Sequence, residues 1–194
     1  MKQLLTYLLV ILFVAFCVLE YNDEIEAQYT FTDNTSKENY LRTIISNDSG
    51  SDESINQVIA ELAKVPENVL LSFLKTGGRI QIVNINHKFV AGSFDTTVAG
   101  DYIIKVAPEY ADYATLHEIG HYFARINHIE NDARFKQCLQ EKEKAVNSIF
   151  ERNRYFYDDS EYFAEMFKYY CNGDLNEYEF PLTVGYLEIL ISEF

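Results

Sequence analysis

Two histidines separated by three residues constrain this chain more than any other feature of its sequence. His117 and His121 stand in a pattern that predicts a helix over residues 109–126. Positions i and i+4 of an α-helix lie about 40° apart around its axis and one turn along it, so both imidazoles project from one face. Glu118 follows the first histidine, where its carboxylate can take a proton from a water that a shared metal ion activates. The pattern His-Glu-x-x-His therefore predicts a catalytic zinc site with Glu118 as the general base.

A catalytic zinc ion needs a third protein ligand and one open position. The two remaining histidines, His87 and His128, fall at a strand end and in a loop, where we expect exposed or locally hydrogen-bonded side chains. Glu161 and Glu165 are better candidates, because they share one face of a helix predicted over residues 160–171. One carboxylate can bind the metal while the other accepts a hydrogen bond from a ligand imidazole. The alternative is an exposed acidic stripe on an ordinary amphipathic helix.

The N-terminal segment differs in composition from the rest of the chain. Lys2 precedes an almost unbroken apolar run over residues 4–19, and an acidic, polar stretch follows. This layout is typical of a secretory signal peptide, here residues 1–27 with the small Ala27 before the cleavage site. An uncleaved membrane anchor is the alternative, because the apolar run falls a little short of the roughly 20 residues that span a bilayer. In both cases we expect residues 28–194 to form a single domain outside the cytoplasm.

Composition and charge limit the classes of partner. The chain has 194 residues, 48% of them hydrophobic, which suits one domain with a proper core. The net charge of −14 predicts repulsion from nucleic acid and from anionic membrane surfaces. We therefore expect a monomer that binds a protein or peptide and touches a membrane only if residues 4–19 remain as an anchor. Cys138 and Cys171 permit one disulfide, although two reduced, buried thiols are favoured.

The hydrophobic periodicity predicts an α+β domain, in which a small sheet lies between helical blocks of the sequence. Strands are predicted over residues 79–86 and 101–107, and residues 92–100 have the composition of a turn. The C-terminal half is mainly helical. Helices are predicted over residues 36–46, 53–65, 67–76, 109–126, 132–152, 160–171 and 183–192.

The two candidate metal-binding segments together resemble a known family. H-E-I-G-H at 117–121 is followed, 161 − 121 = 40 residues later, by E-Y-F-A-E at 161–165. This pair resembles the catalytic domain of anthrax lethal factor and its small secreted relatives, the clostridial and bacillar Pro-Pro endopeptidases. The segment A-G-D-Y at 99–102 is also similar to the stretch that precedes the zinc helix in that family. The resemblance covers approximately residues 65–194.

The resemblance implies a zincin-like fold of the gluzincin type, one Zn²⁺ ion and extracellular action. It also implies that Glu161 is the third ligand and that Glu165 is the supporting carboxylate. Ala124 is a departure, since relatives often carry an aspartate at this position, three residues after the second histidine. This departure bears on how finely the ligands are oriented.

The same family uses a tyrosine ahead of the glutamate motif to stabilise the oxyanion of the transition state. A phenol there donates a hydrogen bond to a charge that develops only during the reaction. The usual spacing of seven residues falls on Arg154 in this chain, since 161 − 7 = 154. We favour the adjacent Tyr155 as the oxyanion donor, with Tyr157 as the alternative.

The sequence therefore predicts a secreted zinc metalloendopeptidase. We expect it to act on extended peptide segments bound antiparallel to an edge of the sheet, and the resemblance points to Pro-rich segments of surface proteins. One alternative is a non-catalytic lethal-factor-like module that binds an extracellular protein. Retention of all four motif residues argues against it, because a binding module has no physical need for His117, Glu118, His121 and Glu161 together. A membrane-anchored peptidase is the other alternative.

Overall fold

The computed structural model describes most of the chain beyond its N-terminal segment, namely residues 33–48, 51–85, 91–98, 100–149 and 158–194. The chain divides into two compact units, Met1–Lys37 and Glu38–Phe194, and the second contains the elements that position the site. The predicted signal peptide, its cleavage point and the apolar run over residues 4–19 lie outside the described residues. In the described ranges no helix is long and apolar enough to cross a membrane.

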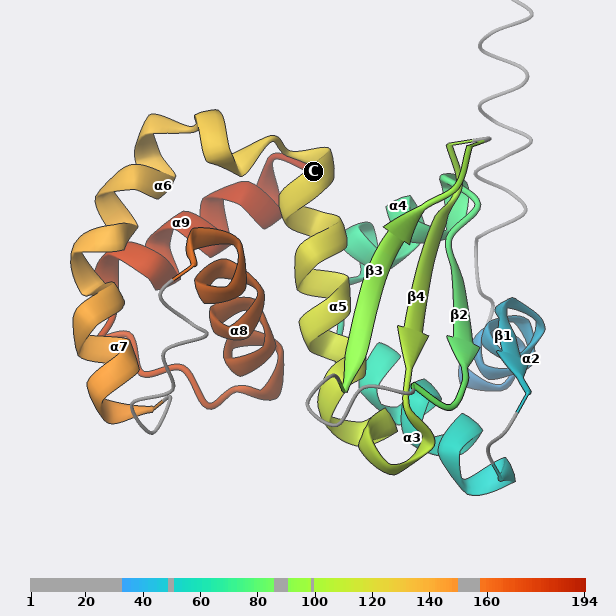
Figure 1. Cartoon of the computed structure of the whole chain (residues 1–194). Coiled ribbons are helices and arrows are strands. Elements are labelled where there is room, and N and C mark those ends of the chain that lie inside the picture. The colour runs from blue at the N-terminus through green and yellow to red at the C-terminus, as the bar shows by residue number, and fades with distance from the viewer. Residues whose placement is uncertain (1–32, 49–50, 86–90, 99, 150–157) are drawn as a thin grey trace, which may run out of the picture. The chain divides into compact units, whose positions relative to one another are not determined.

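A four-stranded mixed sheet occupies one part of the second unit (Figure 1). Its strands are β1 (Ile45–Asn47), β2 (Arg79–Ile82), β3 (Gly92–Thr96) and β4 (Tyr102–Val106), in the spatial order β1-β2-β4-β3. Strand β2 runs parallel to both β1 and β4, whereas β3 is antiparallel to β4. Because β3 comes last in this spatial order, it forms an edge of the described sheet. The inward residues of the central strands are fully buried: Ile80, Ile82, Ile104 and Val106.

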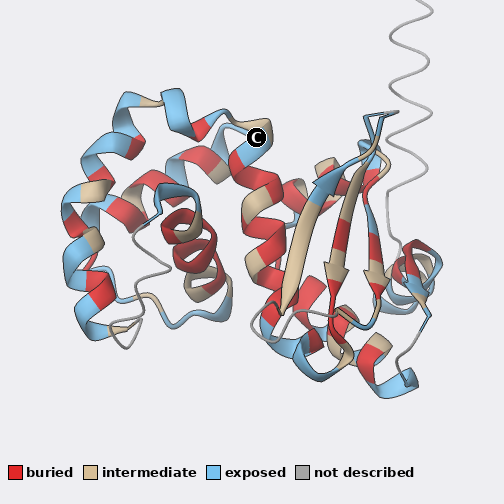
Figure 2. Ribbon diagram, in the orientation of Figure 1, coloured by how far each residue is buried: buried red, intermediate tan, exposed pale blue. Residues whose placement is uncertain are grey.

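Helix α5 (Ala111–Ile126) connects the sheet to the helical half of the fold. It packs against β3 and β4, against α3 (Asp52–Leu62), and against α8 (Asp159–Asn172) (Figure 1). Both α5 and α8 are buried along much of their length (Figure 2). The two helices meet in an aromatic core, in which Phe123 of α5 contacts Phe163 and Phe167 of α8.

Five more α-helices complete the described part of the chain, and α8 is bounded by clear capping residues. The others in the described residues are α2 (Asn34–Ile44), α4 (Glu67–Lys75), α6 (Ala133–Cys138), α7 (Lys142–Ser148) and α9 (Pro181–Ser192). α8 starts after Asp158, whose carboxylate accepts backbone N–H groups of the first turn, and stops at Gly173, whose φ of 74° suits glycine. Cys138 and Cys171 are free thiols, as favoured from the sequence, but only Cys138 is buried and Cys171 is partly exposed.

Three details of the predicted secondary structure are wrong. The predicted helix over residues 36–46 ends at Ile44, because Ile45–Asn47 pairs with β2 as strand β1. The predicted turn over residues 92–100 contains strand β3, whose backbone pairs with β4. The single helix expected over residues 132–152 is interrupted by a 3₁₀ turn at Leu139–Glu141. Tertiary hydrogen bonds override local propensity where the two strands form.

Candidate metal centre

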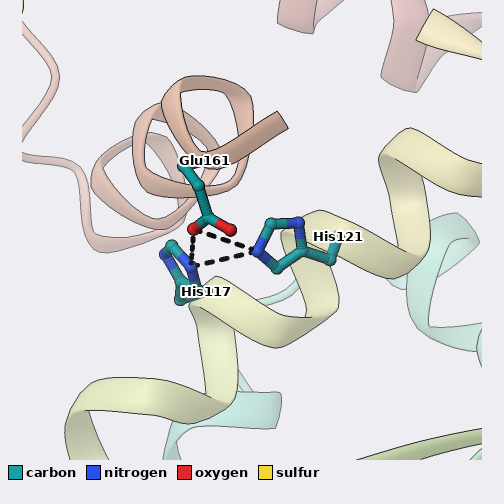
Figure 3. Close-up of side chains that lie close together, drawn as sticks. All are labelled: His117, His121 and Glu161. Atoms are coloured by element: carbon teal, nitrogen blue, oxygen red, sulfur yellow. Dashed lines mark hydrogen bonds and ion pairs between the residues drawn. The ribbon is translucent and has the colours of Figure 1, made fainter. Parts of the chain in front are cut away.

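α5 and α8 bring together the three predicted ligands, His117, His121 and Glu161 (Figure 3). Nε2 of His117 lies 3.1 Å from Nε2 of His121 and 3.1 Å from Oε2 of Glu161. Nε2 of His121 lies 3.3 Å from the same Glu161 oxygen. Tetrahedral zinc with bonds of about 2.05 Å requires its ligand atoms to be about 3.3 Å apart. The triangle of these three atoms therefore has the size that a zinc ion requires.

Hydrogen bonds on the far sides of the imidazoles determine what faces the centre of this triangle. Nδ1 of His117 lies 2.8 Å from Oε2 of Glu165, and Nδ1 of His121 lies 3.1 Å from Oγ of Ser160. A carboxylate can only accept, so we assign the Nδ1 proton of His117 to its bond with Glu165. With the same tautomer for His121, both Nε2 lone pairs and the Glu161 oxygen point at one another. Three converging lone pairs repel unless a cation lies between them.

Without a metal, a proton must lie among His117, His121 and Glu161, and the pKa values of His117 and Glu161 are shifted accordingly. Burial lowers the pKa of His117, but hydrogen bonds with Glu161 and Glu165 outweigh it and raise that pKa to about 9. Burial raises the pKa of Glu161, whereas its hydrogen bonds with both histidines lower it to about 2. The arrangement of these side chains therefore favours a positive charge between them.

Glu118, the candidate base, is buried beside the two histidines. Its side chain is buried, and its Oε2 atom has no hydrogen-bond partner among the described residues. Burial raises its pKa to about 7, although the nearby imidazoles of His117 and His121 act in the opposite direction. A buried carboxylate oxygen without a partner is costly in an ordinary core. It is expected in a site where a water molecule or substrate supplies the missing hydrogen bond.

Two glycines bring the site together by close backbone approach, and neither was singled out from the sequence. A Cβ on Gly120 would lie 2.7 Å from the Cα atom of Ala164, so α5 and α8 are in backbone contact beside the ligands. A Cβ on Gly92 would lie 2.7 Å from Oε1 of Glu118, so strand β3 packs directly against the candidate base. The Gly120 position inside the predicted motif was the available signal for the first of these contacts.

Of the other residues considered from the sequence, some lie in the ligand group, some lie away from it, and some are outside the described residues. Glu165 is 3% exposed and contacts His117, the arrangement expected of a supporting carboxylate. His128 lies on the surface with its side chain 73% exposed, away from the ligand group. Ser160, which sequence reasoning did not identify, contacts His121. His87 and both oxyanion candidates, Tyr155 and Tyr157, lie outside the described residues, and the oxyanion assignment stays a prediction.

A hollow of about 280 Å³ opens beside His121, on the side of the ligand group formed by the end of α5. Ser160 and His121 line it, together with charged and apolar side chains. The apolar lining residues are Phe94, Ala124, Ile129, Phe135 and Leu139. Phe94 belongs to strand β3, so the hollow and this edge strand of the described sheet adjoin the same candidate metal-binding group.

Comparisons with known proteins agree with these features. Residues 102–178 match the family model described as anthrax toxin lethal factor, N- and C-terminal domain. Among solved structures, the chain is similar to the Pro-Pro endopeptidase PPEP-2 from Paenibacillus alvei, with a TM-score of 0.55 and 17% sequence identity. This similarity covers 79% of this chain and 99% of the endopeptidase chain. No curated protein matches the chain in sequence.

The two matches confirm the resemblance to lethal-factor-like Pro-Pro endopeptidases that the sequence motifs indicated. They also confirm the α+β, zincin-like fold with a small mixed sheet and a largely helical C-terminal half. The matched segment includes both motifs, H-E-I-G-H at 117–121 and E-Y-F-A-E at 161–165.

Proposed function

We propose that this chain is a secreted zinc-dependent endopeptidase of the gluzincin type. His117, His121 and Glu161 hold one zinc ion, and Glu118 is the general base. The observation that carries the proposal is the triangle of three lone-pair atoms, 3.1 to 3.3 Å apart, beside a buried carboxylate oxygen that lacks a partner among the described residues. Ordinary ion pairs on a helix surface do not produce this combination.

The chemistry follows from the positions of the side chains. A zinc ion at this site would polarise the peptide carbonyl and lower the pKa of water towards about 7. Glu118, with a pKa of about 7 in the absence of metal, would accept a proton from the attacking water. The same carboxyl group would then donate that proton to the leaving amine nitrogen. Glu165 and Ser160 keep the imidazoles oriented throughout.

The surroundings of the site suit a peptide in extended conformation. Strand β3 is an edge strand next to α5, and no other described strand pairs with its outer side, so its backbone groups there can bind a substrate strand. The hollow beside His121 can take a side chain of that strand. The similar enzyme PPEP-2 is a Pro-Pro endopeptidase, and we extend this to propose that Pro-containing segments of extracellular proteins are substrates. Export rests on residues 1–27 as a signal peptide.

The experiment is incubation of the purified protein with a peptide library that includes Pro-Pro sequences. We expect cleavage that a chelator abolishes and added zinc restores. Glu118→Ala is the matched variant, because it removes the base and leaves all three ligands: zinc should remain bound at one ion per chain while hydrolysis is lost. Unchanged cleavage by the zinc-loaded Glu118→Ala protein would disprove the assigned role. Zinc binding by the wild type without any cleavage would instead favour the binding-module alternative.

A further inference from the structure

A buried lysine lies next to the candidate metal centre, at a position that the proposed chemistry does not use. Lys168 is on α8, three residues after Glu165, and is 6% exposed. Its Nζ atom lies 2.5 Å from Oε1 of Glu165 and 3.7 Å from the centroid of the Tyr113 ring. Lysine is almost never buried to this extent unless it is paired. Here a carboxylate and an aromatic face together hold the ammonium group.

Lys168 makes the third of three successive side-chain contacts between α8 and α5. Along α8, Glu161, Glu165 and Lys168 fall on one face, because their spacings are four and three residues. Glu161 contacts His121 and Glu165 contacts His117. Lys168 contacts Tyr113, which lies one turn before His117 on α5. The two helices therefore run antiparallel at the site.

Both carboxylate oxygens of Glu165 have partners in this set of contacts. Oε2 contacts Nδ1 of His117 at 2.8 Å, and Oε1 contacts the ammonium of Lys168 at 2.5 Å. A carboxylate with one oxygen held by a buried cation cannot rotate freely. The orientation of Glu165, and with it the tautomer and ring position of His117, thus depends on Lys168.

We propose that Lys168 is a positioning residue of the metal centre, which strengthens zinc binding by fixing the Glu165 carboxylate that orients His117. The inference rests on the proposed metal site but not on peptide hydrolysis. Lys168 touches neither the ligand atoms nor the general base in the described contacts; it acts through Glu165 alone.

The direct electrostatic effect of Lys168 has the opposite sign. An ammonium group and a zinc ion repel, so removing the lysine charge by itself would strengthen zinc binding. Loss of the Glu165 orientation weakens it, because partners of ligand histidines typically contribute about 10- to 100-fold in metal affinity. The sign of the change therefore separates a positioning role from a merely electrostatic one.

The test is the zinc affinity of Lys168→Met, measured by competition with a chromophoric chelator. We expect affinity about tenfold weaker than that of the wild type. Lys64→Met is the matched control, because Lys64 pairs with the buried Glu61 at the same spacing and the same 2.5 Å distance. Among the described residues its side chain also donates to Asn172, which is not part of the ligand group, so the Lys64→Met variant should leave zinc affinity unchanged. Equal or stronger zinc binding by Lys168→Met would overturn the proposal.

A double-mutant cycle with Glu165→Gln tests the route of the effect. If Lys168 acts through Glu165, Lys168→Met should change zinc affinity by less than about twofold when Glu165 is already glutamine. Additive losses would contradict the proposal. Should Lys168→Met fail to fold, as judged by its metal-free thermal transition, Lys168→Gln replaces it with the same expected sign. A protein that binds zinc with this coupling but cleaves no peptide would refute the proposed function and leave the role of Lys168 intact.

Discussion

Gly120 sets the distance between the two helices that carry the ligands, so Gly120→Ala should weaken the metal site without altering any ligand. The new Cβ would lie 2.7 Å from Cα and 2.9 Å from the carbonyl oxygen of Ala164. Non-bonded carbon atoms prefer separations of about 3.5 to 4.0 Å, so α8 must move away by about 1 Å. Because both contacting atoms belong to the backbone, no side-chain rotation can relieve the contact.

The displacement acts directly on Glu161, which lies one turn before Ala164 on the same helix. Metal–ligand distances tolerate errors of only about 0.2 Å, so a shift of about 1 Å in one ligand is several times too large. We expect zinc affinity to fall on the order of 100-fold, which removes about 2.7 kcal/mol of zinc-dependent stabilisation at a fixed excess of zinc. The metal-free protein should lose less: overpacking costs about 1 to 3 kcal/mol, and the higher helix propensity of alanine offsets about 1 kcal/mol.

The assay is denaturant unfolding of Gly120→Ala with and without zinc, alongside chelator competition. Gly185→Ala is the matched control, because Gly185 is also helical but a Cβ added there would meet no atom within 4 Å. It should stabilise the protein by up to about 1 kcal/mol and leave zinc affinity unchanged. Wild-type zinc affinity in folded Gly120→Ala would refute the argument that backbone contact between α5 and α8 sets the ligand geometry.

Four further predictions concern the base, the ligands, the pH dependence of stability and the fold. Gly92→Ala should keep zinc bound but lower kcat at least about tenfold, because the added methyl group displaces the carboxylate of Glu118; equal kcat with one zinc per chain would contradict this. Zinc binding at pH 7 should release about one proton, because the pKa of His117 is about 9 without metal and the ligand must be neutral; calorimetry in two buffers of different ionisation enthalpy measures it. By the same shift, the stabilisation that His117 gives the metal-free protein is full below about pH 6.5 and is lost as the pH rises through about 9. Glu141→Ala should cost about 3 kcal/mol in urea unfolding, because that carboxylate accepts two backbone N–H groups at the start of α9; a loss under about 1 kcal/mol would refute this.

The parts of the site that could be predicted from sequence are those that depend on one helix at a time. The spacing of His117 and His121 fixes their common face through helix geometry alone. The spacing of Glu161 and Glu165 does the same on the second helix, and the resemblance to a known family assigned the first as ligand and the second as supporting carboxylate. In the structure both carboxylates contact His117, each at a different ring nitrogen, and their roles stay a prediction.

Features that depend on how elements meet could not be predicted in this way. Lys168 is an ordinary position on an amphipathic helix until α5 places the Tyr113 ring over its ammonium group. Strand β1 has only three residues, and its pairing with β2, distant in sequence, decides its conformation. Ser160 begins a helix in the sequence, and only the fold brings His121 to its hydroxyl group. In each case the deciding interaction joins segments far apart in the sequence.

Strand β3 shows why a segment beside the candidate site was hard to predict. Gly92 suggested a turn, because glycine weakens strands and favours irregular backbone. In the fold the same residue begins an edge strand, and its missing side chain leaves the space that the Glu118 carboxylate occupies. A residue with better strand propensity would have made β3 easier to predict and would have pushed the candidate base out of place. At Gly92, strand propensity favours a larger residue, whereas the space needed by the Glu118 carboxylate requires glycine.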